Sequence, residues 1–224
     1  MPGASLRSAL IFLGLLVGAT ACNAKAGAAA AVPAPAQDAK LATVSGQQTA
    51  VVAGGCFWGI QAVFQHVKGV ISATSGYSGG SVKNPEYELV STGETGHAES
   101  VQILYDPSQI TYGELLRVFF SVAHDPTELN RQGPDEGTQY RSAIFYTSDE
   151  QKRIAEAYIA QLDNAQAFPR KVVTQVVPLQ AFYKAEAYHQ NYAALHPNQP
   201  YIVFNDAPKL EHLRQEFPGL YSAK

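Results

Sequence analysis

The sequence predicts an α+β protein, in which a ferredoxin-like split β-α-β mixed sheet is followed by additional C-terminal helices. Two observations predict this class. Short β-branched or alternating runs, which are typical of strands, occur between longer runs with helical spacing, and Gly, Pro or Asp-Pro separates them. The resulting order is β-α-β-β-α-β-α-β-α-α, and its first six members match the split β-α-β arrangement.

The predicted strands are residues 49–53, 70–77, 98–105, 139–146 and 171–177, and the predicted helices are residues 56–67, 111–122, 148–162, 184–195 and 208–216. The first strand is β-branched and ends at two glycines, and the helix after it has apolar residues at helical spacing. The second strand closes at a Ser-Gly-Gly turn, and the third alternates until Asp-Pro. Thr111 and Glu114 form a capping box at the start of the second helix. A cap at Ser148 begins the third helix, and the last strand stops before Pro178.

The N-terminal segment differs in composition from the rest, and residues 1–21 are predicted to be a signal peptide. An apolar run at 9–17 is too short to span a bilayer comfortably, and small residues follow it up to Cys22. Cys22 also resembles the lipid acceptor of a bacterial lipoprotein, so a soluble periplasmic form and a form tethered by a lipid on Cys22 both remain open. Residues 22–48 are rich in Ala and Pro and are predicted to be a flexible tether, which leaves residues 49–224 as the catalytic domain.

The composition excludes several classes of partner. The net charge is −3 at neutral pH, and the sequence has no basic run or acidic tail. Nucleic acid is bound through clustered Lys and Arg, so no nucleic-acid partner is expected. The hydrophobic content of 46% is enough for one core, and we expect a monomer with one folded domain. His97, His189 and His196 lack the spacing of a metal site, so no metal is expected.

Cys56 is the single cysteine of the predicted folded region. An exported domain with one internal cysteine is not a disulfide scaffold, and an unpaired thiol there needs a reason. Cys56 lies between a strand and a helix, where unpaired N–H groups and the positive end of the helix dipole stabilise a thiolate. Gly54 and Gly55 leave the backbone open to a substrate. These features favour an ionised, solvent-open thiolate over a structural core cysteine.

Phe57 and Trp58 follow Cys56 at consecutive helical positions, and such side chains cannot both point into one core. At least one of them is therefore expected near the sulfur or at the surface. The glycine- and histidine-containing motifs farther along the chain are each also consistent with a plain turn or strand entry when they are considered singly.

Taken together, these motifs resemble the signature blocks of peptide methionine sulfoxide reductase A. The blocks occur in that family's order, with similar separations, from about residue 51 to residue 200. They are Gly55-Cys56-Phe57-Trp58-Gly59, Gly76-Tyr77-Ser78-Gly79-Gly80, Gly96-His97-Ala98-Glu99, His124-Asp125-Pro126-Thr127 and Gly137-Thr138-Gln139-Tyr140-Arg141-Ser142. The resemblance implies an enzyme that reduces methionine S-sulfoxide, both protein-bound and free, and so repairs oxidised proteins and peptides.

The resemblance also implies a role for each residue of the reaction centre. Cys56 attacks the electrophilic sulfur of the sulfoxide, which leaves a sulfenic acid on Cys56 and releases methionine. Glu99, kept protonated by burial, donates to the sulfoxide oxygen. The hydroxyl groups of Tyr77 and Tyr140 hold the same oxygen as neutral donors.

Three further residues complete the implied substrate site. Phe57 and Trp58 form an apolar slot for the methyl group of the substrate, and Asp135 positions the substrate backbone.

The C-terminal region departs from the family pattern, in which many members carry resolving cysteines. The corresponding residues here, 198–206, contain no cysteine. No bound cofactor is expected, and the resemblance implies that an external thiol, from a thioredoxin-like or glutaredoxin-like protein, reduces the sulfenic acid. Cys22 remains a distant alternative, because a flexible tether of this length could span about 30 Å.

Two interpretations from other classes also remain open. A cysteine hydrolase would need a histidine within hydrogen-bond reach of Cys56, and His97 is the candidate near it in the sequence. A tethered binding domain with an inert Cys56 would need no such partner.

Overall fold

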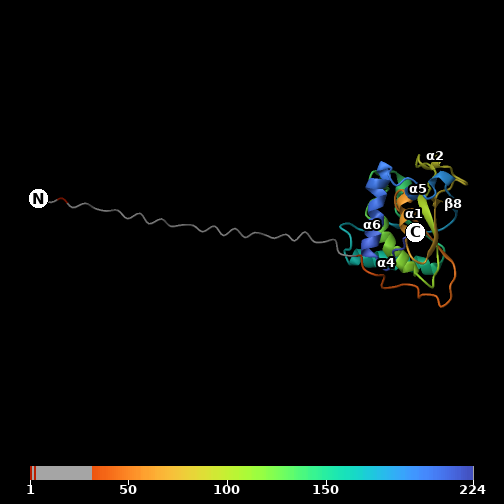
Figure 1. Cartoon of the computed structure of the whole chain (residues 1–224), viewed down its shortest axis with the longest axis horizontal. Coiled ribbons are helices and arrows are strands. Elements are labelled where there is room, and N and C mark those ends of the chain that lie inside the picture. The colour runs from red at the N-terminus through yellow and green to blue at the C-terminus, as the bar shows by residue number, and fades with distance from the viewer. Residues whose placement is uncertain (2, 4–31, 224) are drawn as a thin grey trace.

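The computed structural model describes residues 1, 3 and 32–223 of the 224-residue chain. Cys22 and, apart from residues 1 and 3, the predicted signal peptide at 1–21 lie outside the described residues. The described part of the chain is α+β, as predicted, and helices pack against a central sheet (Figure 1).

The sheet has six strands in the order β7-β6-β1-β3-β2-β8. They are β1 Gln48–Ala53, β2 Val70–Ser78, β3 Ala98–Tyr105, β6 Ala143–Tyr146, β7 Gln175–Pro178 and β8 Phe182–Lys184. Neighbouring strands are antiparallel except for β6 and β7, which are parallel, so the sheet is mixed, as predicted. β4 (Arg131–Gln132) and β5 (Asp135–Glu136) form a separate hairpin.

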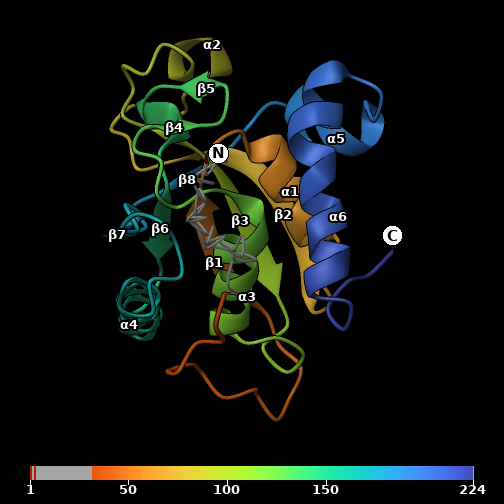
Figure 2. The same ribbon diagram turned by 90° about the vertical axis from the view of Figure 1, so that its left-hand side faces the viewer.

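The α-helices are α1 Phe57–Gln65, α2 Tyr87–Val90, α3 Tyr112–Val118, α4 Asp149–Asn164, α5 Tyr192–Leu195 and α6 Ala207–Glu216. Residues of α1, α3, α4 and α6 share one hydrophobic cluster with Val52 and Val101 of the sheet. Val51 and Phe145 face the opposite side, where Phe182 packs against them, because side chains alternate along a strand. Figure 2 shows α1 and α6 side by side along the sheet.

Two helix starts follow the signals in the sequence. The Thr111 hydroxyl accepts from the backbone N–H of Glu114 at 3.1 Å, and both halves of the predicted capping box are present. The helix predicted at 111–122 is α3, which continues as a π-helical turn at Phe119–Ala123. Ser148 caps α4 with its side chain, as predicted.

Two predicted strands begin later than expected. The strand predicted at 139–146 is β6 and starts at Ala143, because residues Thr138–Tyr140 form a 3-10 turn. The strand predicted at 171–177 is β7 and starts at Gln175. The short helix α2 and the β4–β5 hairpin carry no clear periodic signal and were not predicted.

The helix predicted at 184–195 is wrong. This stretch contains the end of β8, a 3-10 turn (Ala187–His189) and the four-residue α5. The side chain of Gln190 exchanges hydrogen bonds with the backbone N–H and carbonyl of Ser75 at 3.1 and 3.0 Å, and Asn191 adopts a left-handed conformation with φ 59°. These tertiary contacts override the helical spacing of the sequence.

The predicted flexible tether at 22–48 needs a correction in its described part, which begins at residue 32 and contacts the domain. The hydroxyl of Tyr158 donates to the carbonyl of Pro33 at 2.6 Å. The carboxylate of Asp38 accepts from the backbone N–H of Gly113 at 2.7 Å, at the start of α3. The composition argument counted apolar residues and missed these polar attachments.

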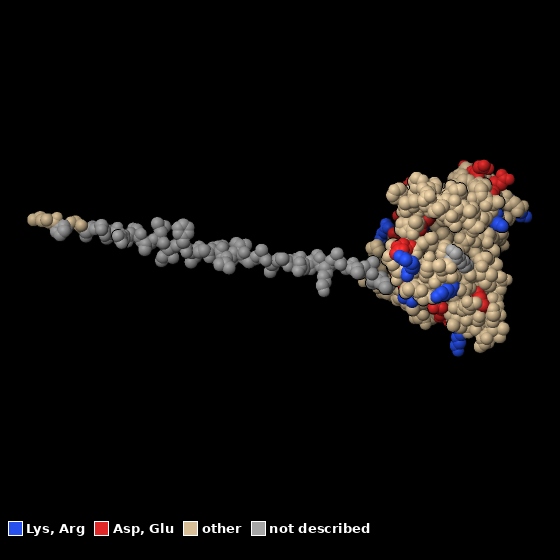
Figure 3. All heavy atoms as spheres, viewed as in Figure 1, with Lys and Arg blue, Asp and Glu red and all other residues tan. Residues whose placement is uncertain are grey.

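No helix among the described residues is long and apolar enough to cross a membrane. On the face drawn in Figure 3, Lys and Arg are scattered among Asp and Glu and do not gather in one basic area. This face therefore lacks the basic stripe that is typical of nucleic-acid binding.

Candidate active site

Cys56 follows the turn at the end of β1 and is the N-cap residue of α1. Gly55 in this turn has φ +93°, a conformation that glycine adopts without steric cost. The backbone N–H of Gly55 donates to the carbonyl of Tyr140 at 3.1 Å, which ties the turn to the segment before β6. The predicted position of the cysteine between a strand and a helix is confirmed.

Cys56 is less open than predicted, since it is 8% exposed and belongs to the core cluster. Burial, followed by the negative charge of Glu99, raises the pKa of Cys56 well above its ordinary value. The backbone N–H of Trp58 lowers the pKa of Cys56, as expected at a helix N-terminus, but by less. The prediction of an ionised, solvent-open sulfur in the free protein is wrong, because it counted the helix end and not the burial.

Glu99 of β3 lies beside Cys56 and is 2% exposed. Its Oε2 atom accepts a hydrogen bond from the backbone N–H of Phe57 at 3.0 Å. Burial raises the pKa of Glu99 to about 8, although the Phe57 N–H acts against this rise. A carboxyl group with this pKa carries a proton at neutral pH, which suits the predicted proton donor.

The two tyrosines that the sequence placed together differ in burial and in the contacts of their hydroxyl groups. Tyr77 is fully buried, and its hydroxyl donates to Oε2 of Glu186 at 2.8 Å. Tyr140 is half-buried, and burial with the nearby charges of Glu99 and Cys56 raises its pKa. Tyr140 therefore lies near Glu99 and Cys56. The predicted role of Tyr77 is corrected, because its one hydroxyl proton is already donated to Glu186.

Tyr87 of α2 lies at the centre in place of Tyr77. Burial and the charges of Glu99 and Cys56 raise the pKa of Tyr87 to about 12. Its backbone N–H donates to Oε1 of Glu186 at 2.7 Å. Its signal in the sequence, one aromatic residue in a polar loop, was too weak to single it out.

Phe57 and Trp58 diverge, as their consecutive positions predict. Phe57 is buried, and its ring packs against Tyr77 and His189 at centroid distances of 5.9 and 4.9 Å. Trp58 is half-buried and stacks on Tyr192 at 3.8 Å. Its indole N–H donates to Nδ1 of His189 at 3.2 Å. Trp58 thus presents a ring near the surface, whereas Phe57 supports the site from inside.

Asp135 and an ion pair from the C-terminal region lie around this centre. The hydroxyl of Tyr201 donates to the carboxylate of Asp135, and burial raises the pKa of Asp135. Asp206 is buried and lies 3.2 Å from the ammonium group of Lys209. No motif in the sequence pointed to Tyr201, Asp206 or Lys209.

The histidine that the hydrolase interpretation needs is engaged elsewhere. Nδ1 of His97 accepts from the backbone N–H of Gly80 at 3.1 Å, so Nε2 carries the proton that it donates to the carbonyl of Val82 at 2.7 Å. His97 therefore cannot take a proton from Cys56. Within the described ranges, no group of three or more His, Cys, Asp and Glu side chains could hold a metal ion.

The whole constellation lies within one family model. The model for peptide methionine sulfoxide reductase matches residues 48–219, from the start of β1 to beyond α6. The chain belongs to the peptide methionine sulfoxide reductase family. Its activity is that of a peptide-methionine (S)-S-oxide reductase.

Individual relatives agree with this assignment. The chain is 60% identical over 179 residues to the peptide methionine sulfoxide reductase MsrA 2 of Mesorhizobium japonicum, which covers 80% of this chain and 92% of the relative. It is 52% identical over 182 residues to MsrA 2 of Synechocystis, and this alignment covers 81% of this chain and 85% of the relative.

Solved structures of the family have the same fold. Methionine sulfoxide reductase A of Corynebacterium diphtheriae matches with a TM-score of 0.60 and 37% identity, covering 69% of this chain and 77% of that one. Reduced Mxr1 of Saccharomyces cerevisiae matches with a TM-score of 0.61 and 31% identity, and the match covers 73% of this chain and 92% of that one.

Proposed function

We propose that this reductase acts on protein-bound and free methionine S-sulfoxide through a sulfenic acid on Cys56. The observation that carries the proposal is the buried pair of Cys56 and Glu99, in which a nucleophile lies beside a carboxyl group that is protonated at neutral pH. A sulfoxide needs both, because its sulfur becomes electrophilic when its oxygen is protonated or strongly hydrogen-bonded.

The proposed step transfers one oxygen atom and two electrons. Glu99 donates its proton to the sulfoxide oxygen, and the hydroxyl groups of Tyr87 and Tyr140 hold that oxygen as neutral donors. The Cys56 sulfur passes its proton to the Glu99 carboxylate left by that donation and attacks the sulfoxide sulfur with an electron pair. The sulfoxide sulfur is reduced and leaves as the thioether of methionine, while the Cys56 sulfur is oxidised and keeps the oxygen as sulfenic acid.

The raised pKa of Cys56 suits this sequence of events. A thiol in the free enzyme reacts slowly with oxidants, because the thiolate is the reactive form. The partial positive charge of a polarised sulfoxide sulfur stabilises the thiolate once substrate is bound. The nucleophile therefore forms where its target is already in place.

We also propose that an external thiol reduces the sulfenic acid. In the described residues, the region 198–206 contains a π-helical turn (Ile202–Asp206) that leads into α6, and it offers no cysteine to Cys56. One thiol of a thioredoxin-like or glutaredoxin-like protein would attack the Cys56 sulfur and release water, and a second thiol would then free Cys56 from the mixed disulfide.

The recycling proposal is tested on the oxidised full chain. After one turnover without reductant, thioredoxin or glutaredoxin with its own reductant is added, and the return of the Cys56 thiol is followed by alkylation and mass. We expect the Cys22→Ser variant to recycle as the wild type does. A Cys22–Cys56 disulfide in the wild type, lost in Cys22→Ser, would overturn the external-thiol route.

The predicted export and the monomeric state stay proposals. The apolar run at 9–17, which ends in small residues before Cys22, supports export to a bacterial periplasm or tethering by a lipid on Cys22. Mass spectrometry of the mature N-terminus from soluble and membrane fractions separates the two forms. Sedimentation of the purified chain tests the monomer.

The function itself is tested with the two sulfoxide epimers, free and in a peptide, and a chemical dithiol as reductant. We expect turnover of the S epimer in both forms, none of the R epimer, and none with Cys56→Ser. Turnover by Cys56→Ser at the wild-type rate would refute the proposed nucleophile.

A further inference from the structure

The imidazole of His124 lies directly against Gly54, in the turn that leads to Cys56. A Cβ atom at Gly54 would lie 2.7 Å from Cγ of His124, which is closer than such atoms approach in proteins. The ring therefore fills the space that the glycine leaves open. Considered singly, the motif that contains His124 is consistent with a plain turn, and this contact gives it a second role.

Two hydrogen bonds fix the His124 ring in one orientation. Nδ1 lies 3.1 Å from the carbonyl of Phe119, so this nitrogen donates, and Nε2 accepts from the hydroxyl of Ser142 at 2.7 Å. The Ser142 oxygen lies 2.7 Å from the hydroxyl of Thr174 and is held in turn. The ring also stacks on Phe119 at 4.0 Å. Ser142 is two residues after Tyr140, so the ring links the Gly54 turn to the Tyr140 segment.

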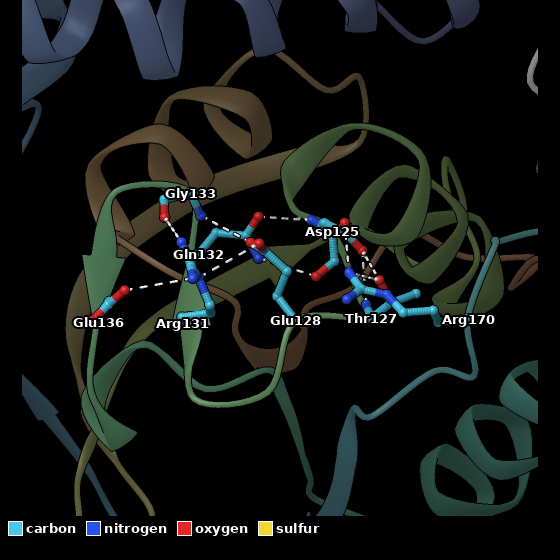
Figure 4. Close-up of polar contacts among 8 residues, drawn as sticks. All are labelled: Asp125, Thr127, Glu128, Arg131, Gln132, Gly133, Glu136 and Arg170. Carbon is cyan, nitrogen blue, oxygen red and sulfur yellow. Dashed lines mark hydrogen bonds and ion pairs between the residues drawn. The ribbon is translucent and has the colours of Figure 1, made fainter.

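The side chain of Gln132 lies against the second glycine of the turn. A Cβ atom at Gly55 would lie 2.5 Å from Cγ of Gln132. The Gln132 amide is fixed by two hydrogen bonds to the backbone of Asp125, whose N–H donates to Oε1 at 2.9 Å and whose carbonyl accepts from Nε2 at 3.0 Å (Figure 4). Because Asp125 directly follows His124, both side chains belong to one connected unit.

Polar contacts brace the loop that carries this unit. The backbone N–H and the hydroxyl of Thr127 donate to Oδ1 of Asp125 at 2.8 and 2.7 Å (Figure 4). Arg131 lies 3.6 Å from Glu128 and 3.4 Å from Glu136, across the base of the β4–β5 hairpin. These contacts connect the segment after His124 to the hairpin that carries Gln132.

We propose that His124 and Gln132 are positioning residues of the reductase, which hold the Gly54–Gly55 turn from two sides and so fix Cys56 against Glu99. We call the two side chains the diglycine clamp. Neither is placed at the sulfoxide, so the clamp acts through the backbone that carries Cys56. A displacement of the attacking atom by about 1 Å costs on the order of a hundredfold in rate, while substrate binding is little changed.

The inference rests on Cys56 as the proposed nucleophile and is tested by single-turnover kinetics with the S-sulfoxide on the full chain. Gln132→Ala removes the Cγ contact at Gly55 and both hydrogen bonds to Asp125, while its Cβ atom stays against the turn. Gly54→Ala forces a Cβ atom into the His124 ring, and the double variant Gly54→Ala/His124→Ala gives that atom room. Ile154→Ala is the matched control, because it removes buried side-chain volume from α4, away from the turn.

We expect Gln132→Ala and Gly54→Ala to lower the rate of methionine release by about tenfold to a hundredfold, with KM changed less than about twofold. The double variant should recover part of the rate lost in Gly54→Ala. The emission of Trp58, the one tryptophan of the chain, should shift in Gly54→Ala and move back in the double variant. Ile154→Ala should keep the wild-type rate at an equal or larger loss of stability in urea.

Two results would overturn the clamp while leaving the proposed function intact. One is a wild-type single-turnover rate for Gln132→Ala. The other is a rate loss in Ile154→Ala as large as that in Gly54→Ala at the same loss of stability, because the rate would then follow stability alone. Turnover by Cys56→Ser, included in the same experiment, would instead remove the nucleophile on which the inference rests.

Discussion

Replacing Glu99 by glutamine separates the chemical role of its buried carboxyl group from the cost of burying it. The glutamine amide keeps the shape of the side chain and an oxygen that accepts from the Phe57 N–H, but it has no acidic proton to give. The structure makes two predictions for this variant, one for activity and one for stability, and they have opposite signs.

The stability prediction follows from the pKa of Glu99, which burial raises from an ordinary 4.5 to about 8. Because the pKa of Glu99 is higher in the folded than in the unfolded protein, its full contribution to stability is present at pH values below the unfolded-state pKa. This contribution is lost as the pH rises toward 8. Each pH unit between the two pKa values changes the free energy of unfolding by about 1.36 kcal/mol. The wild type therefore loses about 3 to 4 kcal/mol of unfolding free energy between pH 5 and pH 8 through Glu99. Glu99→Gln does not titrate in this range and should lose none of it.

The assay is urea unfolding of wild type and Glu99→Gln at pH 5, 6, 7 and 8. We expect the stability difference to move steadily in favour of the variant as pH rises, because Cys56 stays protonated throughout this range. In single turnover with the S-sulfoxide, the same variant should lose about 100-fold to 10,000-fold in rate. A stability difference that stays constant from pH 5 to 8 would refute the reasoning, because Glu99 would then be ionised in the folded protein.

Other predictions concern individual contacts. Tyr77→Phe should cost about 1 kcal/mol of unfolding free energy in urea, because its hydrogen bond to Glu186 is lost, and its kcat should stay within about twofold of the wild type. Tyr140→Phe should instead lower kcat by about tenfold or more. Equal kcat values for the two variants would contradict the placement of Tyr140, and not Tyr77, at the sulfoxide oxygen. Thr111→Ala should cost about 1 kcal/mol in urea unfolding, because the cap of α3 is lost, and an unchanged midpoint would argue against it. Burial lowers the pKa of His124 to about 4, so the wild type should lose about 2 kcal/mol more than His124→Gln between pH 7 and pH 4.5, and parallel stability curves would show that the ring is not buried as a neutral group.

Local signals in the sequence predicted the fold where neighbouring residues decide the structure. The capping box at Thr111 and the two glycines before Cys56 act within a few residues, and the structure contains both features as expected. The stretch 184–195 fails as a helix because Gln190 bonds to the distant Ser75, a contact that no local pattern reveals. Pairings over such distances are the part of the fold that spacing cannot supply.

In the active site, too, local motifs were predicted correctly, and features that depend on distant contacts were not. Cys56, Glu99 and Tyr140 lie in motifs and were predicted, and the structure brings them together. Tyr77 was misplaced because a tyrosine in a motif gives no sign of where its hydroxyl points. The protonation of Cys56 was mispredicted for a related reason. The N-terminal end of a helix can be located in the sequence, but the burial that outweighs it is a property of the assembled core.

The account depends most directly on oxygen transfer from the substrate to Cys56. Full-length protein, freed of all reductant, is mixed with an excess of the S-sulfoxide, and methionine release and the mass of the Cys56 peptide are measured together. We expect one methionine for each chain and one added oxygen on Cys56, which a sulfenic-acid reagent traps. Methionine release with Cys56 unmodified, or no release with this thiol intact, would contradict the central claim.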